Sequence, residues 1–237
     1  MRPGADPFGA DRGRSFSAVA DVYAATRPDY PPEAVHWIAM PRTTDVLDLG
    51  AGTGKLTRAL AEVGFTVTAV EPLPEMLNLL RIDGVRVTAG TAEHIPLGTA
   101  RVDAVYAGQA FHWFRAGEAL AEIARVLRPG GRLGLLWNML DLRVDWVQQL
   151  SGVLHEQARA GYDPGRQRPF DSPLFTGLTY RRFTHPGQQI DLAGLLDLVR
   201  SRSYVVTLAP TEREDVLARV TRLVRTHPDL RWRTTFT

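Results

Sequence analysis

Alternating apolar and polar stretches indicate a regular exchange of strands and helices from Asp45 to Asn138. Runs rich in Val, Leu and Ala predict strands at 45–49, 65–70, 85–89, 102–107 and 132–137. Apolar residues that recur every three or four positions predict helices at about 54–63, 74–81 and 115–127. Strands that alternate with helices favour an α/β fold with a mostly parallel sheet and helices on both faces. The last of these helices should end in a tight turn at Arg128-Pro129-Gly130-Gly131.

The flanking segments follow a less regular pattern. Residues 1–15, rich in Gly, Pro, Asp and Arg, are expected to be disordered, and two short helices are predicted within 16–40, the second opened by Pro31-Pro32. Beyond Asn138 the pattern predicts a helix near 144–154, a loop at 161–173, strands at 178–184 and 203–208, and helices at 192–200 and 211–226. A capping box of Thr211 and Glu214 should start the last helix.

No linker interrupts the sequence, so we expect a single domain over residues 1–237. Its core is 45–138, preceded by the helices of 16–40, and 139–237 supplies a cap and the last strands. Hydrophobic residues make up 44% and charged residues 23% of the chain, which is typical of a globular protein with a full core.

Composition and charge exclude several functions. Cysteine is absent and the six histidines are scattered, so disulfides, thiolate chemistry and a metal site are not expected. The net charge is only +2 and the arginines are dispersed, which argues against a nucleic-acid partner. No leader pattern or membrane-length apolar run is present, so a membrane is not expected either. The sequence predicts a cytoplasmic monomer or homodimer.

The most informative motif is Asp48-x-Gly50-x-Gly52-x-Gly54, where a predicted strand gives way to a predicted helix. Glycines at alternate positions allow a sharp turn and let a ligand approach the backbone where a Cβ would clash. The turn alone is also compatible with simple helix–sheet packing.

The spacing argues against two common relatives of this motif. A dinucleotide fingerprint would need glycine at position 55, which is Lys55. A phosphate-binding loop would need glycine at position 49 and Ser or Thr at position 56, which are Leu49 and Leu56. The motif therefore has no cradle for a polyphosphate.

A carboxylate follows the next predicted strand. Glu71 lies 21 positions after Gly50 (71 − 50), close to the spacing at which nucleotide-binding βαβ units place an acid on ribose hydroxyls. A lone charge at a strand end is more often solvated, but together with the glycine turn it favours a ligand with an unphosphorylated ribose.

Further motifs follow in a recognisable order: Val70-Glu71-Pro72 with Met76, Gly90-Thr91-Ala92-Glu93, Gln109-Ala110-Phe111-His112-Trp113-Phe114, and Arg125-Val126-Leu127-Arg128-Pro129-Gly130-Gly131. Before them stands Phe16-Ser17-x-x-Ala20-x-x-Tyr23-x-x-x-Arg27-Pro28-x-Tyr30. Together with the glycine turn, this order resembles the class I S-adenosylmethionine-dependent methyltransferases, in particular the type 11 branch with its trans-aconitate methyltransferase-like enzymes. The resemblance implies a Rossmann-like, seven-stranded, mostly parallel sheet, whose final antiparallel strand would be cut short at Thr237. It also implies S-adenosylmethionine as cofactor, S-adenosylhomocysteine as product and a small-molecule methyl acceptor.

The resemblance assigns roles to matching positions near the glycine turn. Gly50 and Gly52 would lie against the methionine part of the cofactor, with Asp48 near its amino group. Glu71 would hold the ribose hydroxyls.

It also implies contacts with the adenine. Pro72 and Met76 would pack against the ring, although Met76 at helical spacing could equally belong to the core. Ala92 and Glu93 would bond the adenine edge through a main-chain amide and a side chain.

At the methionine end, the resemblance implies contacts from Gln109 and Ala110. Tyr23 and Arg27 would close over this end, Arg27 through a fork of donors that suits a carboxylate.

Four residues near predicted strand ends are candidates for the acceptor side. A packed corner would explain the aromatic run, but three aromatics around a histidine in a loop favour a substrate-facing role for His112 and Trp113. Trp137 and Asn138 would line the same crevice, because ligands bind outside the carboxyl ends of parallel strands. His112 is the candidate base if the acceptor must lose a proton, and otherwise it orients the substrate.

Two other functions remain open on the sequence. A protein that binds S-adenosylmethionine without methylating would carry the same glycine turn and Glu71. A nicotinamide-dependent oxidoreductase is disfavoured by Lys55 in place of glycine.

Overall fold

The computed structural model describes residues 27–158, 172–184, 188–227, 231–232 and 234–236, which form parts of two compact units. The sheet unit comprises Pro28–Met139, Pro164–Pro186 and Thr234–Thr237. The helical unit comprises Met1–Arg27, Leu140–Asp163 and Gly187–Arg233. The predictions for 1–26 and for most of the 161–173 loop fall outside the described residues, and the single domain stays a prediction.

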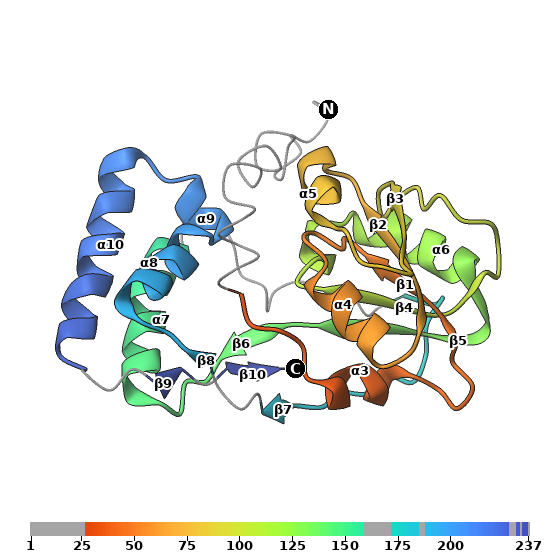
Figure 1. Ribbon diagram of the computed structural model, residues 1–237, viewed down its shortest axis with the longest axis horizontal. Helices are drawn as coiled ribbons and strands as arrows, with labels where there is room; N and C mark the ends of the chain where they lie inside the picture. Colours follow the sequence, from red (N-terminus) through yellow and green to blue (C-terminus); the bar gives the residue numbers. More distant parts are fainter. Residues whose placement is uncertain (1–26, 159–171, 185–187, 228–230, 233, 237) are drawn as a thin grey trace. The chain divides into compact units, whose positions relative to one another are not determined.

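A five-stranded parallel sheet forms the centre of the sheet unit, in the order β3-β2-β1-β4-β5 (Figure 1). Its strands are β1 (Asp45–Leu49), β2 (Thr66–Glu71), β3 (Arg86–Ala89), β4 (Val102–Gly108) and β5 (Leu127–Leu136). β1 is central and pairs in parallel with both β2 and β4. The predicted α/β fold is confirmed, and the first four predicted strands agree with the structure to within one residue.

The fifth strand begins earlier than predicted. β5 starts at Leu127, immediately after the preceding helix, and its pairing with β4 shifts from Val102↔Leu127 to Ala104↔Arg132. The predicted separate turn at 128–131 was therefore wrong: these residues form an irregularity within β5. Gly130 has φ of 80°, and a Cβ on Gly131 would lie 2.9 Å from the Asp103 carbonyl oxygen, so both positions need glycine.

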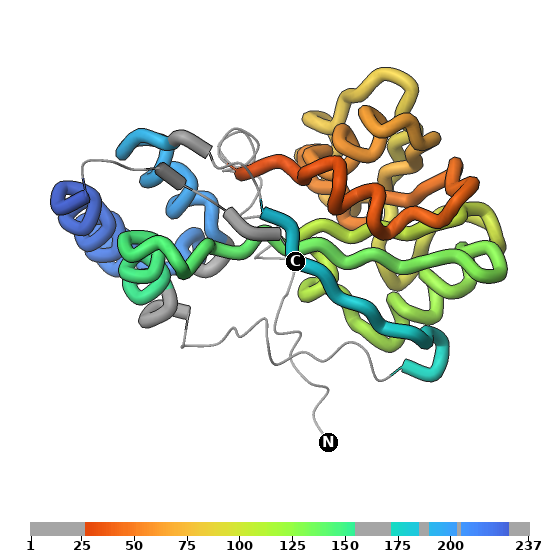
Figure 2. The backbone as a smooth tube through the Cα atoms, turned by 90° about the horizontal axis from the view of Figure 1, so that it is seen from below, coloured from red at the N-terminus to blue at the C-terminus, as the bar shows by residue number. Residues whose placement is uncertain are grey.

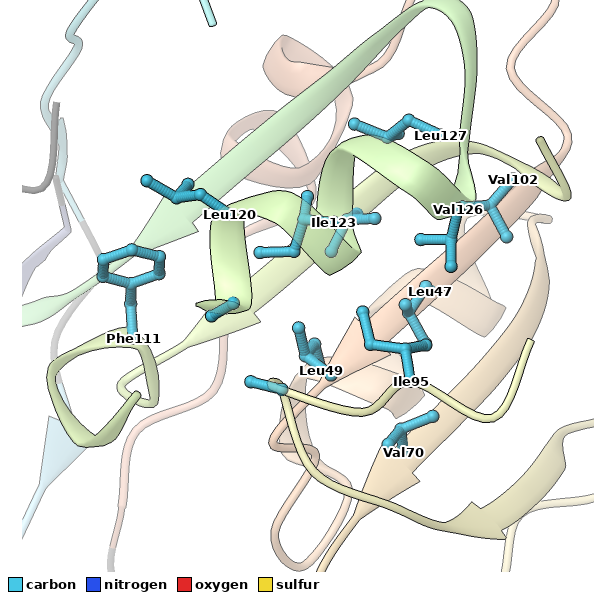
Figure 3. Packing of buried hydrophobic residues seen from close by; sticks show 13 residues of the cluster. Leu47, Leu49, Val70, Ile95, Val102, Phe111, Leu120, Ile123, Val126 and Leu127 are labelled. Carbon is cyan, nitrogen blue, oxygen red and sulfur yellow. The ribbon is translucent and has the colours of Figure 1, made fainter. Parts of the chain in front are cut away.

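Helices cover both faces of this sheet. α3 (Pro32–Ile38) and α4 (Lys55–Glu62) pack on one face, and α6 (Ala116–Val126) packs on the other. Neighbouring residues of β1 serve opposite faces: Val46 joins the α3–α4 cluster, whereas Leu47 and Leu49 join the α6 cluster (Figure 3). A short helix, α5 (Pro74–Leu79), follows β2.

A three-stranded sheet follows, made of β6 (Asn138–Leu140), β7 (Phe183–Thr184) and β10 (Thr234–Phe236) in the order β6-β10-β7. Only Trp137 separates the end of β5 from the start of β6. β10 runs antiparallel to β7. The predicted seven-stranded sheet is thus divided, among the described residues, into five strands and a second set of three. The strand predicted at 178–184 forms only at its last two residues.

The helical unit has its own core. α7 (Asp145–Ala158), α8 (Leu192–Arg200) and α10 (Pro210–Arg225) contribute apolar side chains to one buried cluster, and α7 lies beside α10 (Figure 2). β8 (Gln188–Gln189) and β9 (Arg231–Trp232) form an antiparallel pair.

Two predictions for this unit were wrong. Residues 203–208 were expected as a strand because of their β-branched side chains, but α9 (Ser203–Val206) is a helix whose Val205 is fully buried in the helical core. α10 begins at Pro210 rather than 211, and Glu212, not Glu214, accepts a hydrogen bond from the Ala209 amide at its start.

Candidate functional site

The glycine turn connects β1 to α4 through backbone conformations that favour glycine. Gly50, Gly52 and Gly54 have φ of 73°, 57° and 88°. A Cβ on Gly50 would lie 2.7 Å from that of Ala110, so Gly50 also allows the end of β4 to approach. Among the described residues, no atom outside Gly52 and its two chain neighbours lies within 4 Å of a Cβ built on Gly52. The turn thus presents open backbone at Gly52, where a ligand can approach.

Asp48 lies near the end of β1 and is almost fully buried. The Thr57 hydroxyl on α4 donates to its Oδ2 at 2.6 Å, whereas Oδ1 is buried and has no hydrogen-bond partner within the described part of the chain. Burial raises the pKa of Asp48 to about 7; the Thr57 hydrogen bonds oppose this rise and the charge of Glu71 adds to it. Asp48 therefore offers an unused acceptor atom.

Glu71 ends β2 and joins the two loops beside it. Its Oε2 accepts the Gly52 amide at 2.9 Å, and its Oε1 accepts the Leu73 amide at 3.0 Å. Burial raises the pKa of Glu71, although both amides favour the ionised carboxylate. The structure thus places the predicted ribose-binding acid directly on the glycine turn.

The residues predicted to contact the adenine differ in exposure. Pro72 is exposed, whereas Met76 on α5 and Ala92 are buried. Ala92 belongs to the core cluster beneath α6. Glu93 is half-buried, and its Oε1 accepts the Arg115 amide at 2.8 Å. Its predicted contact with the adenine stays a prediction.

The end of β4 brings Gln109 and Ala110 next to the glycine turn. Gln109 has φ of 54°, a left-handed conformation that is uncommon for a residue with a side chain. Its amide donates to the Leu136 carbonyl at 2.9 Å and its Nε2 donates to the Asn138 carbonyl at 3.0 Å. These bonds tie the carboxyl ends of β4 and β5 together.

The aromatic run forms a single turn of 3₁₀ helix at Phe111–Trp113. Phe111 is buried and meets Phe114 edge to face at 5.6 Å between ring centroids. His112 and Trp113 are half-buried, with ring centroids 5.0 Å apart. Phe111 therefore packs in the core, while the next two side chains remain partly accessible. Their substrate-facing role stays a prediction.

Trp137 lies between β5 and β6, and Asn138 is the first residue of β6. Trp137 packs against the core cluster beneath α6. Asn138 Nδ2 donates to the Pro28 carbonyl at 3.2 Å, and its Oδ1 is buried with no hydrogen-bond partner among the residues that the structure describes. Because the Pro28 carbonyl can only accept, this contact fixes the orientation of the amide.

Tyr23 and Arg27 are the two remaining residues predicted to bind the cofactor. Tyr23 lies outside the described residues. Arg27 Nη2 donates to the Ser201 carbonyl at 3.5 Å, within the helical unit. The predicted closure of Arg27 over the cofactor stays a prediction.

Sequence reasoning missed several supporting contacts. Thr57 on α4 was not predicted to hold Asp48, although its place in the first turns of the helix after the motif is a usable signal. Lys55 forms an ion pair with Asp29 at 2.7 Å, and Tyr30 packs over Gly108. These contacts hold the segment 28–30 beside the strand ends, and only tertiary structure reveals them.

None of the helices in the described ranges combines the length and apolar character needed to cross a bilayer. Nor do three or more His, Asp or Glu side chains gather, within the described part of the chain, in a way that could hold a metal ion.

An open glycine turn, buried carboxylates at adjoining strand ends and the Rossmann-like sheet define a nucleotide-type cofactor site. The model of the methyltransferase domain family of type 11 matches residues 47–135, the segment that builds this site. An uncharacterized methyltransferase of Mycobacterium tuberculosis is 44% identical over 227 residues, covering 93% of this chain and 89% of that protein. One from Schizosaccharomyces pombe is 37% identical, covering 91% of this chain and 89% of that protein.

Among solved structures, a protein from Anaeromyxobacter dehalogenans assigned as a type II methyltransferase is 27% identical, with a TM-score of 0.72. The match covers 89% of this chain and 94% of that protein. The chain belongs to the type 11 methyltransferase domain family of the class I enzymes, and it is an S-adenosylmethionine-dependent methyltransferase.

Proposed function

We propose that this enzyme transfers the methyl group of S-adenosylmethionine to a small-molecule acceptor by in-line displacement. The hydrogen bond from the Gly52 amide to Glu71 carries the proposal, because it joins the ribose-binding acid to the glycine turn. S-adenosylmethionine supplies a methyl group already activated on a sulfonium, so the protein has to bind, align and exclude water.

The cofactor would lie across the carboxyl ends of β1, β2 and β4. Its methionine part would follow Gly50 and Gly52 towards Gln109 and Ala110, and its ribose would meet Glu71. The residues fit this placement, because Asp48 Oδ1 is a buried acceptor that lacks a donor and the methionine ammonium supplies one. Pro72, Met76 and Ala92 would border the adenine.

The acceptor would lie on the side of His112, Trp113, Trp137 and Asn138. His112 would remove a proton from a hydroxyl or amine acceptor, or orient a carboxylate that needs no base. Arg27, with Tyr23, would close over the methionine end.

Two similarities support testing acidic compounds first as acceptors. The sequence resembles the branch with trans-aconitate methyltransferase-like enzymes. A relative from Methylococcus capsulatus, 36% identical over 132 residues, is named malonyl-[acyl-carrier protein] O-methyltransferase, and the match covers 51% of this chain. We therefore place small carboxylates ahead of phenols and amines.

Calorimetry of the full chain with S-adenosylmethionine, S-adenosylhomocysteine and NAD tests the proposed cofactor site. We expect the first two to bind and NAD not to bind. Binding of NAD alone would contradict the proposal.

The acceptor is then sought by measuring S-adenosylhomocysteine formed with small carboxylates, phenols and amines. Once an acceptor is found, His112→Gln should lower turnover and change its pH profile if His112 is a base, or raise KM if it orients a carboxylate. His36→Gln is the matched control, because His36 is an exposed residue of α3 outside the proposed site. Equal activity of both variants would remove His112 from the acceptor site.

A further inference from the structure

The side chain of Glu93 forms a hydrogen bond with a loop other than the turn to which Glu93 belongs. Thr91–His94 form a tight turn, closed by a hydrogen bond of 3.3 Å from the His94 amide to the Thr91 carbonyl. Ala92 points into the core, whereas the Glu93 carboxylate accepts the Arg115 amide, 22 positions further along the chain.

Arg115 occupies the junction between the aromatic turn and α6. It follows Phe114 directly and is the residue that precedes the first turn of the helix. Phe111, at the start of the aromatic turn, and Ala92 belong to the same buried cluster, and Figure 3 shows Phe111 beside Leu120 of α6. The bond from Arg115 to Glu93 therefore joins the loop after β3 to the loop after β4.

A local partner for the Arg115 amide was available. Glu118 is the third residue of α6, the position from which a glutamate closes a capping box onto the residue before the helix. Instead, both oxygens of Glu118 accept from the Arg115 guanidinium at 2.8 Å. The Arg115 amide therefore donates to the more distant Glu93. If the Glu93 carboxylate is removed, Glu118 is still in position to accept this amide and cap the start of α6.

The rest of the loop after β3 is fixed to α6 separately. Glu122 accepts the Ile95 amide at 2.9 Å, and Arg125 donates to the carbonyls of Ile95 and Leu97. Loss of the Glu93 contact would therefore free the Thr91–His94 turn without releasing residues 95–97.

We propose that Glu93 is a positioning residue that couples the adenine-side turn, Thr91–His94, to the acceptor-side turn, Phe111–Phe114. This proposal rests on the proposed placement of cofactor and acceptor. A ligand held at Ala92 restrains the adenine-side turn, and Glu93 passes that restraint through the Arg115 amide to His112 and Trp113. The aromatic turn then becomes ordered when the cofactor is bound, before the acceptor arrives.

Hydrogen exchange of the full chain, with and without saturating S-adenosylhomocysteine, tests the coupling. In the unsubstituted protein the ligand should slow exchange in peptides spanning 111–118 by about tenfold, the size expected for one charge-assisted hydrogen bond. Glu93→Ala should reduce this protection to less than about twofold, whereas Glu93→Gln, which keeps an acceptor oxygen, should retain most of it. Undiminished protection in Glu93→Ala would overturn the proposal.

Glu118→Gln is the matched control. It makes the same carboxylate-to-amide change beside Arg115 but leaves the Glu93 contact intact, so the ligand-dependent protection should persist. Its loss in Glu118→Gln would show that the helix start, rather than Glu93, transmits the effect, and would also overturn the proposal.

A direct contact between Glu93 and adenine is tested with S-inosylhomocysteine, which lacks the exocyclic amino group. A positioning residue predicts that Glu93→Ala leaves the ratio of the two dissociation constants, for S-adenosylhomocysteine and S-inosylhomocysteine, unchanged. Collapse of this ratio would assign Glu93 to the adenine instead. Failure of the unsubstituted protein to bind S-adenosylhomocysteine would contradict the proposed function itself, which separates the two outcomes.

Discussion

The parallel sheet carries carboxyl groups at both of its ends, and their hydrogen-bond partners and pKa shifts differ between the two ends. At the amino ends of β1 and β4, Arg128 donates to Asp45 at 2.9 Å and to Asp103 at 2.6 Å. Burial alone would raise the pKa of Asp103, but the Thr44 amide, Arg128 and the Asp45 amide lower it to about 2.

At the carboxyl ends, the described hydrogen bonds to Asp48 and Glu71 come from a hydroxyl and from amides, not from a cation. Burial raises the pKa of both groups. At the amino end, the carboxylates therefore hold strands together through Arg128. At the carboxyl end, burial makes the ionised form of the carboxyl groups unfavourable, and a ligand that donates to them would stabilise that form.

The largest expected effect concerns Asp48. Because its pKa is near 7 in the folded protein and 3.8 is its ordinary value, the folded state keeps a proton that the unfolded chain has lost. Stability should therefore fall as pH rises from about 4 to 7, by roughly 4 kcal/mol from this group. Asp48→Asn should lose this part of the pH dependence in urea unfolding at pH 5 and pH 8. The exposed Asp83→Asn serves as control and should behave like the unsubstituted protein.

Glu71 should have the next largest effect, on cofactor affinity. Glu71→Ala removes the acceptor for the ribose hydroxyls and for the Gly52 amide, and should weaken S-adenosylhomocysteine binding about 100-fold in calorimetry. Glu75→Ala removes an exposed acid four positions later and should leave affinity unchanged. Equal affinity of the Glu71 variant and its control would exclude the ribose role.

A smaller effect is expected at the amino end of the sheet. Arg128→Ala should lower the free energy of unfolding only modestly at pH 7, since the guanidinium is partly exposed. The lowered pKa of Asp103 adds stability above pH 3.8 that is lost as pH falls through about 2. The difference between the two proteins should therefore shrink in urea unfolding at pH 3, without any change in cofactor affinity. A reduced affinity would contradict the separation of the two ends.

The smallest effect is expected for Lys55 and Asp29. Their ion pair is short, but Asp29 is 74% exposed, so a double-mutant cycle with Lys55→Met and Asp29→Asn should give a coupling of about 0.5 kcal/mol. High salt should reduce it further. A coupling that survives in 1 M salt would mean that the segment 28–30 is more firmly docked than this pair implies.

The same contrast explains what the sequence could predict. β1, β2 and the glycine turn were predictable, because apolar runs and alternating glycines are local signals that the sheet reinforces. Glu71 could be placed from its distance to Gly50, since one βαβ unit fixes that geometry.

Contacts formed across the fold were not predictable. The choice of Glu93 over Glu118 as partner for the Arg115 amide depends on how two loops meet. α9 was mistaken for a strand because tertiary packing of Val205 outweighs the strand preference of β-branched residues.

Gly108, at the end of β4, provides space rather than flexibility. A Cβ at this position would lie 2.6 Å from the Tyr30 hydroxyl and 2.9 Å from Leu56 Cδ2. Tyr30 can therefore pack against β4 only if position 108 carries no side chain. A redesign of this enzyme for a new acceptor should therefore keep glycine at position 108. The side chains to vary lie further along the chain, on the proposed acceptor side, at His112 and Trp113.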